Sequence, residues 1–428
     1  MITRILYTVL LSLLSPLLLF GLYRKKVGKP PFGPRWKEHF GITPPCTGQH
    51  PIWIHAVSVG EAIAVIPVIK ALKAQSPHQA IVVTTTTSTG AEQIAKLGDL
   101  VEHRYMPIDF AWCVRGFLQH IQPSALLIME TELWPNTLAT VHQRGIPVIV
   151  MNARLSARSA ARYARFQPFF KLIAQHVDHL LCLHQDDAHR FEQLGIPASH
   201  LTVTGSVKFD LHIEPQLHTQ SAQLRQALGA ERPIWIAAST HKGEDEQVLQ
   251  AFERVKAKHP TSLLIIVPRH PERFDQVEQL CQQYGHCVRR TSGAPVEAST
   301  SIYLADTMGE MLLLLGAADI TFMGGSLLGE RVGGHNMLEP AALGKPTLTG
   351  PSFYNFTDIT QQLADAGALT VCQDADALAD TLTALLADPA QQKQMGQAAL
   401  HVVAHNQGAV AKTLDVLAQQ LSSPHQTD

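Results

Sequence analysis

Several charged side chains directly follow short apolar runs, which is where parallel α/β proteins carry their ligand-binding loops. Glu61 is the first and ends the run Ser58-Val59-Gly60-Glu61, just after the largely apolar stretch 52–57. Gly60 permits a ligand to approach the backbone closely, and a carboxylate at this place can take a proton from a hydroxyl group. The alternative is an ordinary glutamate in a first helical turn, where the helix dipole favours negative charge.

Two further carboxylates, Glu130 and Glu132, follow the five apolar residues 125–129. Charges in that position must be solvated, paired or functional, because an unpaired buried charge is costly. An acidic loop that caps a helix is the alternative. Lys208, at the end of the first predicted domain, is a candidate hinge-region cation that faces the cleft, and a solvent-exposed lysine is the alternative.

Arg269 follows the apolar run 263–267 in the second half of the chain. A guanidinium group suits a two-point contact with phosphate, although a charged surface turn explains the same residues. The turn 238–244 offers hydroxyls and backbone N–H groups that also suit a phosphate, or simply cap a helix.

A glycine-rich stretch, 324–334, precedes a helix that is predicted to open near Asn336 and would place Glu339 in its first turn. An acid in that position can accept hydrogen bonds from both hydroxyls of a ribose. A flexible loop capped by an acid is the alternative. The glycines match neither the dinucleotide fingerprint nor the Walker A loop.

Alternating elements must position these residues. Short all-apolar runs at 52–57, 81–85 and 125–129 are separated by helical patterns, and the rhythm restarts at 234–238 and 263–267. Such runs are typical of parallel sheets covered on both faces. The pattern predicts two Rossmann-like domains that face a cleft, with ligands at the carboxyl ends of the strands.

Composition limits the remaining possibilities. The chain has 428 residues, of which 46% are hydrophobic and 16% charged, as in a globular protein of about two domains. The formal net charge of −2 provides no basic field for nucleic acid. Only His401 and His405 have the spacing of a helical zinc motif, and Val402 stands where its glutamate would be, so no metal site is predicted.

The N-terminus differs from the rest of the chain. The apolar run from Ile5 to Tyr23 approaches the roughly 20 residues that cross a bilayer, and Arg24-Lys25-Lys26 follows it. By the positive-inside rule this charge keeps the rest of the chain in the cytoplasm, next to anionic headgroups. A cleaved signal peptide is the alternative to an uncleaved anchor, and Pro16 leaves open whether the anchor spans the bilayer or lies in its interface.

These features predict four segments: a membrane anchor at 1–27, a linker rich in Pro and Gly at 28–50, an N-terminal Rossmann-like domain at 51–210 and a C-terminal one at 211–428.

Eight motifs, in this order, resemble the Kdo transferases of Gram-negative bacteria, which transfer 3-deoxy-D-manno-octulosonic acid (Kdo) from CMP-Kdo to a lipid A precursor. They are HAVSVGE, METELWPN, NARLSARSA, VTGSVKFD, ASTHKGEDE, VPRHPERF, DTMGEM and GGHNMLEPA. With the N-terminal anchor, the resemblance covers nearly the whole chain.

The resemblance implies an inverting glycosyltransferase of the GT-B fold that uses CMP-Kdo without a metal or cofactor. It implies an inner-membrane protein with both domains on the cytoplasmic side, the first binding the acceptor and the second the CMP-sugar. Glu61 matches the general base of the family, and Glu130 and Lys208 match positions that stabilise the transition state. The matched CMP-binding residues are Pro268, Arg269, Met308, Gly309, Glu310, Asn336, Met337, Leu338 and Glu339.

Two features depart from the family pattern. The segment 327–332 is longer by a residue or two, and Met337 stands where proline is expected, which leaves the geometry of this loop open. Two other functions also stay open: a GT-B transferase that uses a different nucleotide sugar, and a non-catalytic binding protein tethered to the membrane.

Overall fold

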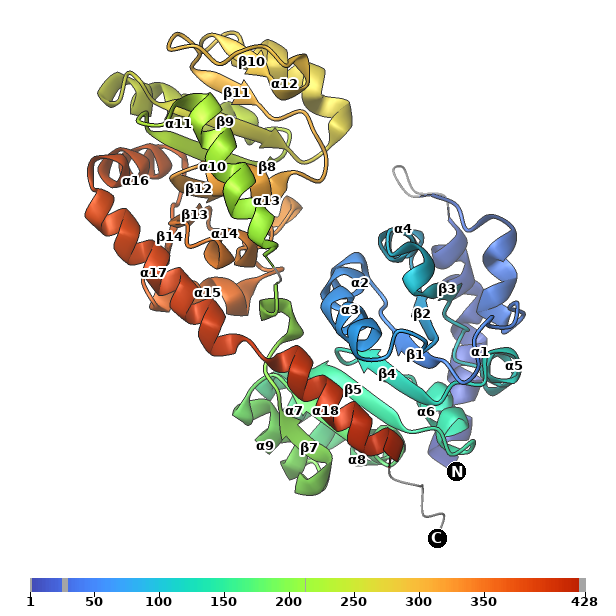
Figure 1. The fold of residues 1–428 in the computed structure, drawn as a ribbon. Helices are drawn as coiled ribbons and strands as arrows, with labels where there is room; N and C mark the ends of the chain where they lie inside the picture. The colour runs from blue at the N-terminus through green and yellow to red at the C-terminus, as the bar shows by residue number, and fades with distance from the viewer. Residues whose placement is uncertain (1, 25–29, 212, 423–428) are drawn as a thin grey trace. The chain divides into compact units, whose positions relative to one another are not determined.

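Two parallel sheets organise the protein in a computed structural model that describes residues 2–24, 30–211 and 213–422 (Figure 1). The chain divides into two compact units. The first comprises residues 1–210 together with 406–428, and the second comprises residues 211–405.

The sheet of the first unit has seven strands in the order β3-β2-β1-β4-β5-β6-β7, all parallel where they pair. The strands are β1 Ile52–His55, β2 Ile81–Thr85, β3 Glu102–Tyr105, β4 Ala125–Met129, β5 Val148–Ala153, β6 His179–Cys182 and β7 Leu201–Val203. Every residue of β1, β2, β4 and β5 is buried, because helices cover both faces of the sheet.

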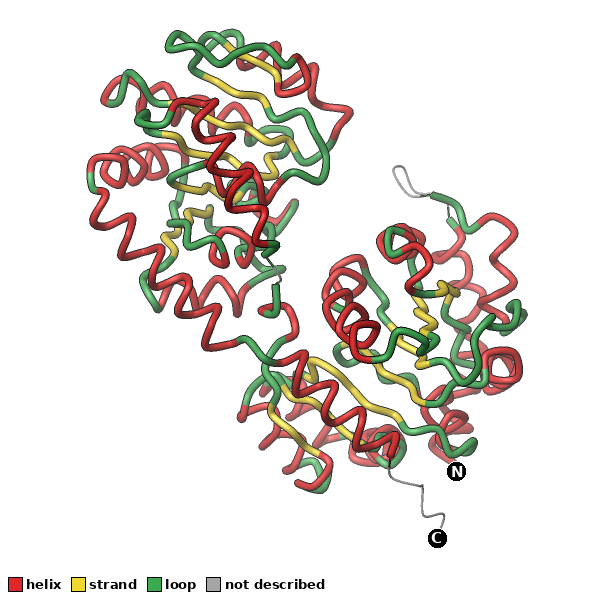
Figure 2. The backbone as a smooth tube through the Cα atoms, viewed as in Figure 1, coloured by secondary structure: helices red, strands yellow, loops and turns green. Residues whose placement is uncertain are grey.

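Helices alternate with these strands, as the red and yellow segments of Figure 2 show. They are α2 Val59–Ala64, α3 Ile66–Gln75, α4 Ser88–Ala95, α5 Ala111–Ile121, α6 Pro135–His142, α7 Ala157–Arg165, α8 Gln167–Ala174 and α9 Gln185–Gln193. Side chains fix several of their starts: Ser58, Thr87 and Ser156 each accept a backbone N–H from the first turn of α2, α4 and α7 respectively.

The second unit repeats the design with the strand order β10-β11-β9-β8-β12-β13-β14. The strands are β8 Ile234–Thr240, β9 Leu263–Pro268, β10 Cys287–Arg289, β11 Ile302–Leu304, β12 Ile320–Met323, β13 Thr347–Thr349 and β14 Leu369–Val371. The helices are α10 Pro215–Gly229, α11 Asp245–Lys258, α12 Phe274–Cys281, α13 Met311–Ala317, α14 Leu338–Ala342, α15 Thr357–Asp365, α16 Ala375–Ala387 and α17 Pro389–Asn406.

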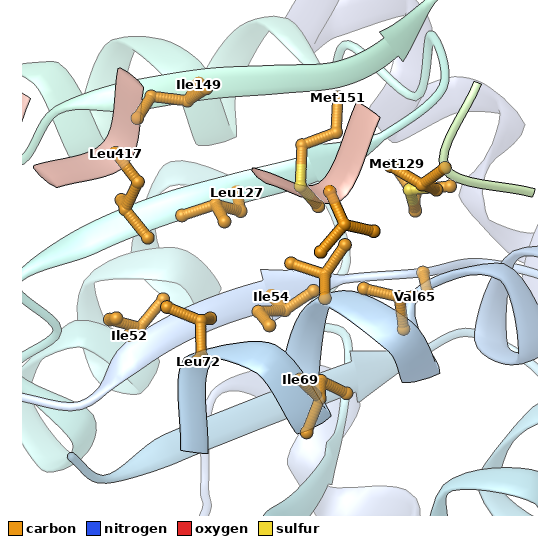
Figure 3. Close-up of a cluster of buried hydrophobic side chains, with 14 of the residues drawn as sticks. Ile52, Ile54, Val65, Ile69, Leu72, Leu127, Met129, Ile149, Met151 and Leu417 are labelled. Atoms are coloured by element: carbon orange, nitrogen blue, oxygen red, sulfur yellow. The ribbon is translucent and has the colours of Figure 1, made fainter. Parts of the chain in front are cut away.

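The last helix, α18 (Ala409–Ser422), departs from the predicted division, which assigned 211–428 to the second domain. The Asp210 carboxylate accepts the backbone N–H groups of Gly408 and Val410, at 2.6 and 2.5 Å, and so fixes the start of α18 in the first unit. Leu417 then enters the core beside residues such as Ile52 and Leu72 (Figure 3). A C-terminal helix that returns to the first unit is therefore part of its core.

The segment predicted as a linker, 28–50, also contains ordered structure. Gly33–Phe40 form a 3-10 helix, η1, that packs on β3. The buried Glu38 carboxylate accepts the Tyr105 N–H at 2.7 Å and pairs with Arg35 at 2.7 Å. Burying a carboxylate requires such partners, and they fix η1 on the sheet edge.

The predicted anchor forms helix α1, Ile2–Tyr23, which is long and apolar enough to cross a membrane by length and composition. It packs against α6 and α8 of the first unit. Residues 1 and 25–27 of the predicted anchor lie outside the described residues.

Candidate active site

Glu61 and Glu130 follow adjacent strands of the first sheet. Strand β1 leads into Glu61 and strand β4 into Glu130, and the two strands pair along their whole length. The chain builds β2 and β3 on one side of β1 and then crosses to β4 on the other side. Ligands of open α/β sheets bind at such a switch point, outside the carboxyl ends of the strands.

The turn after β1 holds the Glu61 carboxylate in place. One oxygen, Oε2, accepts the Val57 N–H at 2.8 Å, and Oε1 accepts the Ser58 hydroxyl at 2.8 Å. Ser58 in turn accepts the backbone N–H of Glu61 at 3.3 Å and caps α2. Each carboxylate oxygen keeps a further lone pair for a substrate hydroxyl.

The surroundings of Glu61 raise its pKa. The residue is 8% exposed, and this burial is the main cause. The hydrogen bonds from Val57 and Ser58 oppose the rise, while the negative charges of Glu130 and Glu132 add to it. A carboxylate with a raised pKa is a stronger proton acceptor than an ordinary glutamate, so the environment suits a general base.

Glu130 forms an ion pair with Lys208, whose Nζ lies 2.9 Å from Oε1. Glu130 has a left-handed backbone with a φ of 59°, and its N–H donates to the Met151 carbonyl at 2.8 Å. The Lys208 and Glu130 side chains are 35% and 40% exposed, and a pair this exposed contributes little to stability. Both groups therefore remain available to a ligand.

The sequence-predicted nucleotide residues lie at the carboxyl ends of strands β9, β11 and β12 in the second unit. Arg269 follows β9, donates its backbone N–H to Thr240 at 2.9 Å and has an exposed side chain. Burial raises the pKa of Glu339. A hydrogen bond with Asn336 and the positive charge of Arg269 have smaller effects that lower this pKa. The structure thus brings Arg269, Asn336 and Glu339 together.

Glu244, which sequence reasoning did not select, holds the glycine-rich loop after β12. Its fully buried carboxylate accepts four backbone N–H groups at 2.6–3.3 Å, from His241, Gly325, Ser326 and Leu327. A Cβ at Gly324 would lie 2.9 Å from Glu244 Oε2, so this contact requires glycine there. Three of the donors are more than 80 positions away in the sequence, which local patterns do not reveal.

Two stacked histidines connect the same loops. The Nε2 atoms of His241 and His335 lie 2.8 Å apart, with ring planes 7° apart. Burial is the main cause that lowers their pKa values, to about 4 and about 3. Both rings are therefore neutral near pH 7, and one donates to the other.

The remaining predicted CMP-binding residues differ in what they offer a ligand. Met337 and Leu338 are buried, and the Leu338 N–H already donates to the Asn336 Oδ1 at 3.1 Å, so these two residues support the loop from within the fold. Glu310 forms a two-point ion pair with Arg290, at 2.5 and 2.7 Å, and this pair is the main cause that lowers the pKa of Glu310. Met308 is 59% exposed, and Gly309 has a φ of 85°, so this turn can present backbone groups.

The long segment 327–332 forms a 3-10 turn, η7 (Gly329–Arg331), that the next loop supports. Tyr354 OH donates to the Glu330 carbonyl at 3.0 Å, and Asn355 Nδ2 donates to the Val332 carbonyl at 2.7 Å. The additional residues therefore extend outward as a braced turn.

Across residues 2–24, 30–211 and 213–422, no group of three or more His, Cys, Asp or Glu side chains could hold a metal ion. The charged side chains among the predicted site residues are the carboxylates of Glu61, Glu130, Glu310 and Glu339, the Lys208 ammonium and the Arg269 guanidinium.

Comparison with known proteins agrees with this architecture. A family model described as 3-deoxy-D-manno-octulosonic-acid transferase (kdotransferase) matches residues 34–211, and a model of glycosyl transferases group 1 matches 236–402. A crystal structure of UDP-GlcNAc 2-epimerase from Neisseria meningitidis is similar over 86% of this chain and all of its own, with a TM-score of 0.58 and 15% identity. The protein is a glycosyltransferase of the GT-B fold.

Two curated relatives narrow this class. A 3-deoxy-D-manno-octulosonic acid transferase of Haemophilus influenzae is 39% identical over 97% of this chain and 98% of its own, and one of Bordetella pertussis is 34% identical over 96% and 98%. The chain therefore belongs to the 3-deoxy-D-manno-octulosonic acid transferase family. The predicted family, fold class and enzyme class are confirmed.

Proposed function

We propose that this protein transfers Kdo from CMP-Kdo to a lipid A precursor, with Glu61 as the general base. One observation carries the proposal: a carboxylate of raised pKa stands at the switch point of the first sheet, beside a second carboxylate and a lysine. The members of its family are named for transfer of the same sugar acid.

In the reaction, the acceptor hydroxyl oxygen attacks the anomeric carbon of Kdo from the side opposite the phosphate. The new glycosidic bond forms as the bond to the phosphate oxygen breaks, and CMP leaves with that electron pair. The hydroxyl proton passes to Glu61, and the anomeric centre inverts. Lys208 is positioned by Glu130 and offsets negative charge that develops in this step.

The second unit holds CMP in this proposal. Arg269 contacts the phosphate, because its guanidinium is exposed and suits two-point binding. Glu339 accepts hydrogen bonds from the ribose hydroxyls. The backbone groups of Met308, Gly309 and Glu310 and the side chain of Asn336 complete the nucleotide site. The buried Met337 and Leu338 support Asn336, and the Leu338 N–H donates to its Oδ1.

Basic residues of the first unit suit the phosphates of the acceptor. Helix α7 has no buried residue and carries Arg158, Arg162 and Arg165. A cavity of about 130 Å³ beside the Glu130 turn is lined by residues that include Thr131, Arg154 and Arg162.

We infer that α1 is a monotopic anchor on the cytoplasmic face of the inner membrane. Near its start, Tyr7 OH donates to the buried Asp109, and near its end Tyr23 OH lies against His39, both at 2.8 Å. The helix from Tyr7 to Tyr23 extends about 24 Å at about 1.5 Å per residue, which is most of the ~30 Å of a bilayer core. The partners in both contacts belong to the first unit. A helix that crossed the bilayer could not keep both contacts, because its two ends would lie on opposite sides of the membrane.

The outer face of α1 suits lipid. Ile2, Leu13 and Leu17 are 73%, 74% and 69% exposed, and they recur at helical spacing on one side. An impermeant thiol reagent tests the orientation on an Ile2→Cys variant in right-side-out vesicles. An in-plane helix leaves this cysteine unlabelled in intact vesicles, whereas its labelling in intact vesicles would show that α1 spans.

The function is tested by incubating the protein with CMP-Kdo and the tetra-acylated lipid A precursor and measuring the mass of the product by mass spectrometry. A mass gain of one or more Kdo residues is expected, and unchanged acceptor would favour a binding protein without catalysis. Calorimetric titration with CMP and with UDP addresses a different nucleotide sugar. Tighter binding of UDP would overturn the assignment of the donor.

A further inference from the structure

An apolar groove lies at the C-terminal end of α1. Its walls include Leu19, Gly21 and Leu22 from α1, and Phe32, Trp36 and Phe40 from the following segment. Its volume is about 830 Å³, within the range of roughly 300–1,000 Å³ that small-molecule sites occupy. A groove of this composition suits a hydrocarbon chain better than a sugar.

The groove wall is linked to the predicted base by hydrogen bonds. Residues 86–88 line the groove where β2 leads into α4. The Thr87 hydroxyl donates to the Val57 carbonyl at 3.3 Å, and the N–H of Val57 donates to Glu61 at 2.8 Å. A single residue therefore separates the groove wall from the Glu61 carboxylate.

The groove also adjoins surfaces suited to a bilayer. Leu18 and Phe20 of α1 are 53% and 65% exposed. Trp36 and Trp112 are 46% and 57% exposed and both pack against Phe40, and exposed tryptophans are typical of the membrane interface. Arg24 lines the groove as well and supplies a positive charge beside the apolar walls.

We propose that this groove receives an acyl chain of the lipid acceptor and so holds the acceptor sugar beside Glu61. The inference rests on the proposed function, since it takes the acceptor to be an acylated sugar phosphate. The continuous apolar surface lets a chain move from the bilayer into the groove without exposure to water. Arg24 meets the anionic headgroup to which the chain is attached.

Gly21→Leu tests the proposal, because a Cβ at Gly21 meets no atom within 4 Å and the longer side chain fills open groove. Leucine also favours helix more than glycine does. Ser12→Leu is the matched control, since Ser12 is exposed on the same helix and does not line the groove. The KM is measured with the tetra-acylated precursor and with its fully deacylated sugar-phosphate backbone.

We expect Gly21→Leu to raise the KM for the acylated acceptor by about tenfold or more, a free energy of 1.4 kcal/mol or more, and to leave the KM for the backbone unchanged. Ser12→Leu should match the wild type with both. An unchanged KM for the acylated acceptor in Gly21→Leu, or equal rises for both acceptors, would overturn the proposal.

A second measurement does not depend on transfer. An acceptor with brominated acyl chains should quench Trp36, and this quenching should fall in Trp36→Phe and in Gly21→Leu but not in Ser12→Leu. Equal quenching in all variants, or stronger quenching by brominated phosphatidylglycerol, would refute acceptor binding. If the wild-type protein transfers Kdo to neither acceptor, the proposed function is refuted. The quenching measurement then still tests whether the groove binds acyl chains.

Discussion

Glu61 and Glu244 occupy corresponding places in the two units but face different surroundings. Each follows the first strand of its unit, β1 or β8, at the switch point of the strand order. Glu61 accepts two hydrogen bonds from its own turn and lies near two other acids. Glu244 accepts four N–H groups, three of them from a distant loop, and is fully buried.

A carboxylate at this position can therefore act in catalysis or stabilise the fold. Its role depends on how many of its lone pairs accept hydrogen bonds from the protein. A carboxylate has about four acceptor sites. The fold fills all four on Glu244, which makes it a structural anion, and leaves two on Glu61, which can meet a substrate. The neutral isostere glutamine separates these roles, because it keeps the shape and loses one acceptor oxygen.

Glu61→Gln should have the largest effect on transfer, a loss of about 10²–10⁴-fold, since a general base contributes that much. Folding should be nearly unaffected, because the amide oxygen can accept the Val57 N–H and the amide nitrogen can donate to Ser58. CMP binding should be kept. Transfer rates, thermal unfolding and calorimetric titration of CMP measure the three effects. Near-normal transfer would remove Glu61 from its role as base.

Glu244→Gln should produce the opposite pattern. Two of the four N–H groups lose their acceptor, at about 1–3 kcal/mol each, so the second unit should lose roughly 2–6 kcal/mol of stability. CMP binding should weaken because the glycine-rich loop loosens. Thermal unfolding and CMP titration are the measurements, with Glu246→Gln, an exposed acid on the same helix, as the control. A stable variant with normal CMP affinity would show that the loop does not depend on Glu244.

The contrast between these acids also shows what sequence could predict. The rule that ligand-binding residues follow apolar strands predicted that Glu61 and Glu130 each lie after a strand of a parallel sheet, and the structure shows that the two strands are adjacent. Glu244 was overlooked because its partners lie 81–83 positions away, where local periodicity carries no information.

Other long-range contacts were hidden in the same way. The return of α18 to the first unit depends on Asp210 accepting N–H groups about 200 positions later. Arg290 holds the Glu310 carboxylate, so this side chain is less available to a ligand at the predicted nucleotide site. Apolar periodicity therefore predicted the sheets, whereas polar contacts between distant loops required the folded chain.

Lys208→Met should have a smaller effect, a loss of about tenfold in transfer with little change in unfolding temperature. The half-exposed pair with Glu130 contributes only about 0–1 kcal/mol to stability, so its removal is felt mainly when negative charge develops. Transfer is compared at saturating acceptor, with Lys412→Met on α18 as a control outside the site. Equal losses of transfer in the two variants would argue against a specific role for Lys208.

Glu132→Gln should have the smallest effect and sharpen the account of the raised pKa of Glu61. Transfer requires deprotonated Glu61, so the rate falls as pH drops through that pKa, and the raised pKa places this fall above the pH expected for an ordinary glutamate. Removing the negative charge of Glu132 lowers the pKa of Glu61, which should move the acidic limb of kcat to lower pH. The profile of Glu246→Gln should overlay the wild type. A shift of the Glu132→Gln limb to higher pH would mean that the neighbouring acids do not act on Glu61 through their charge.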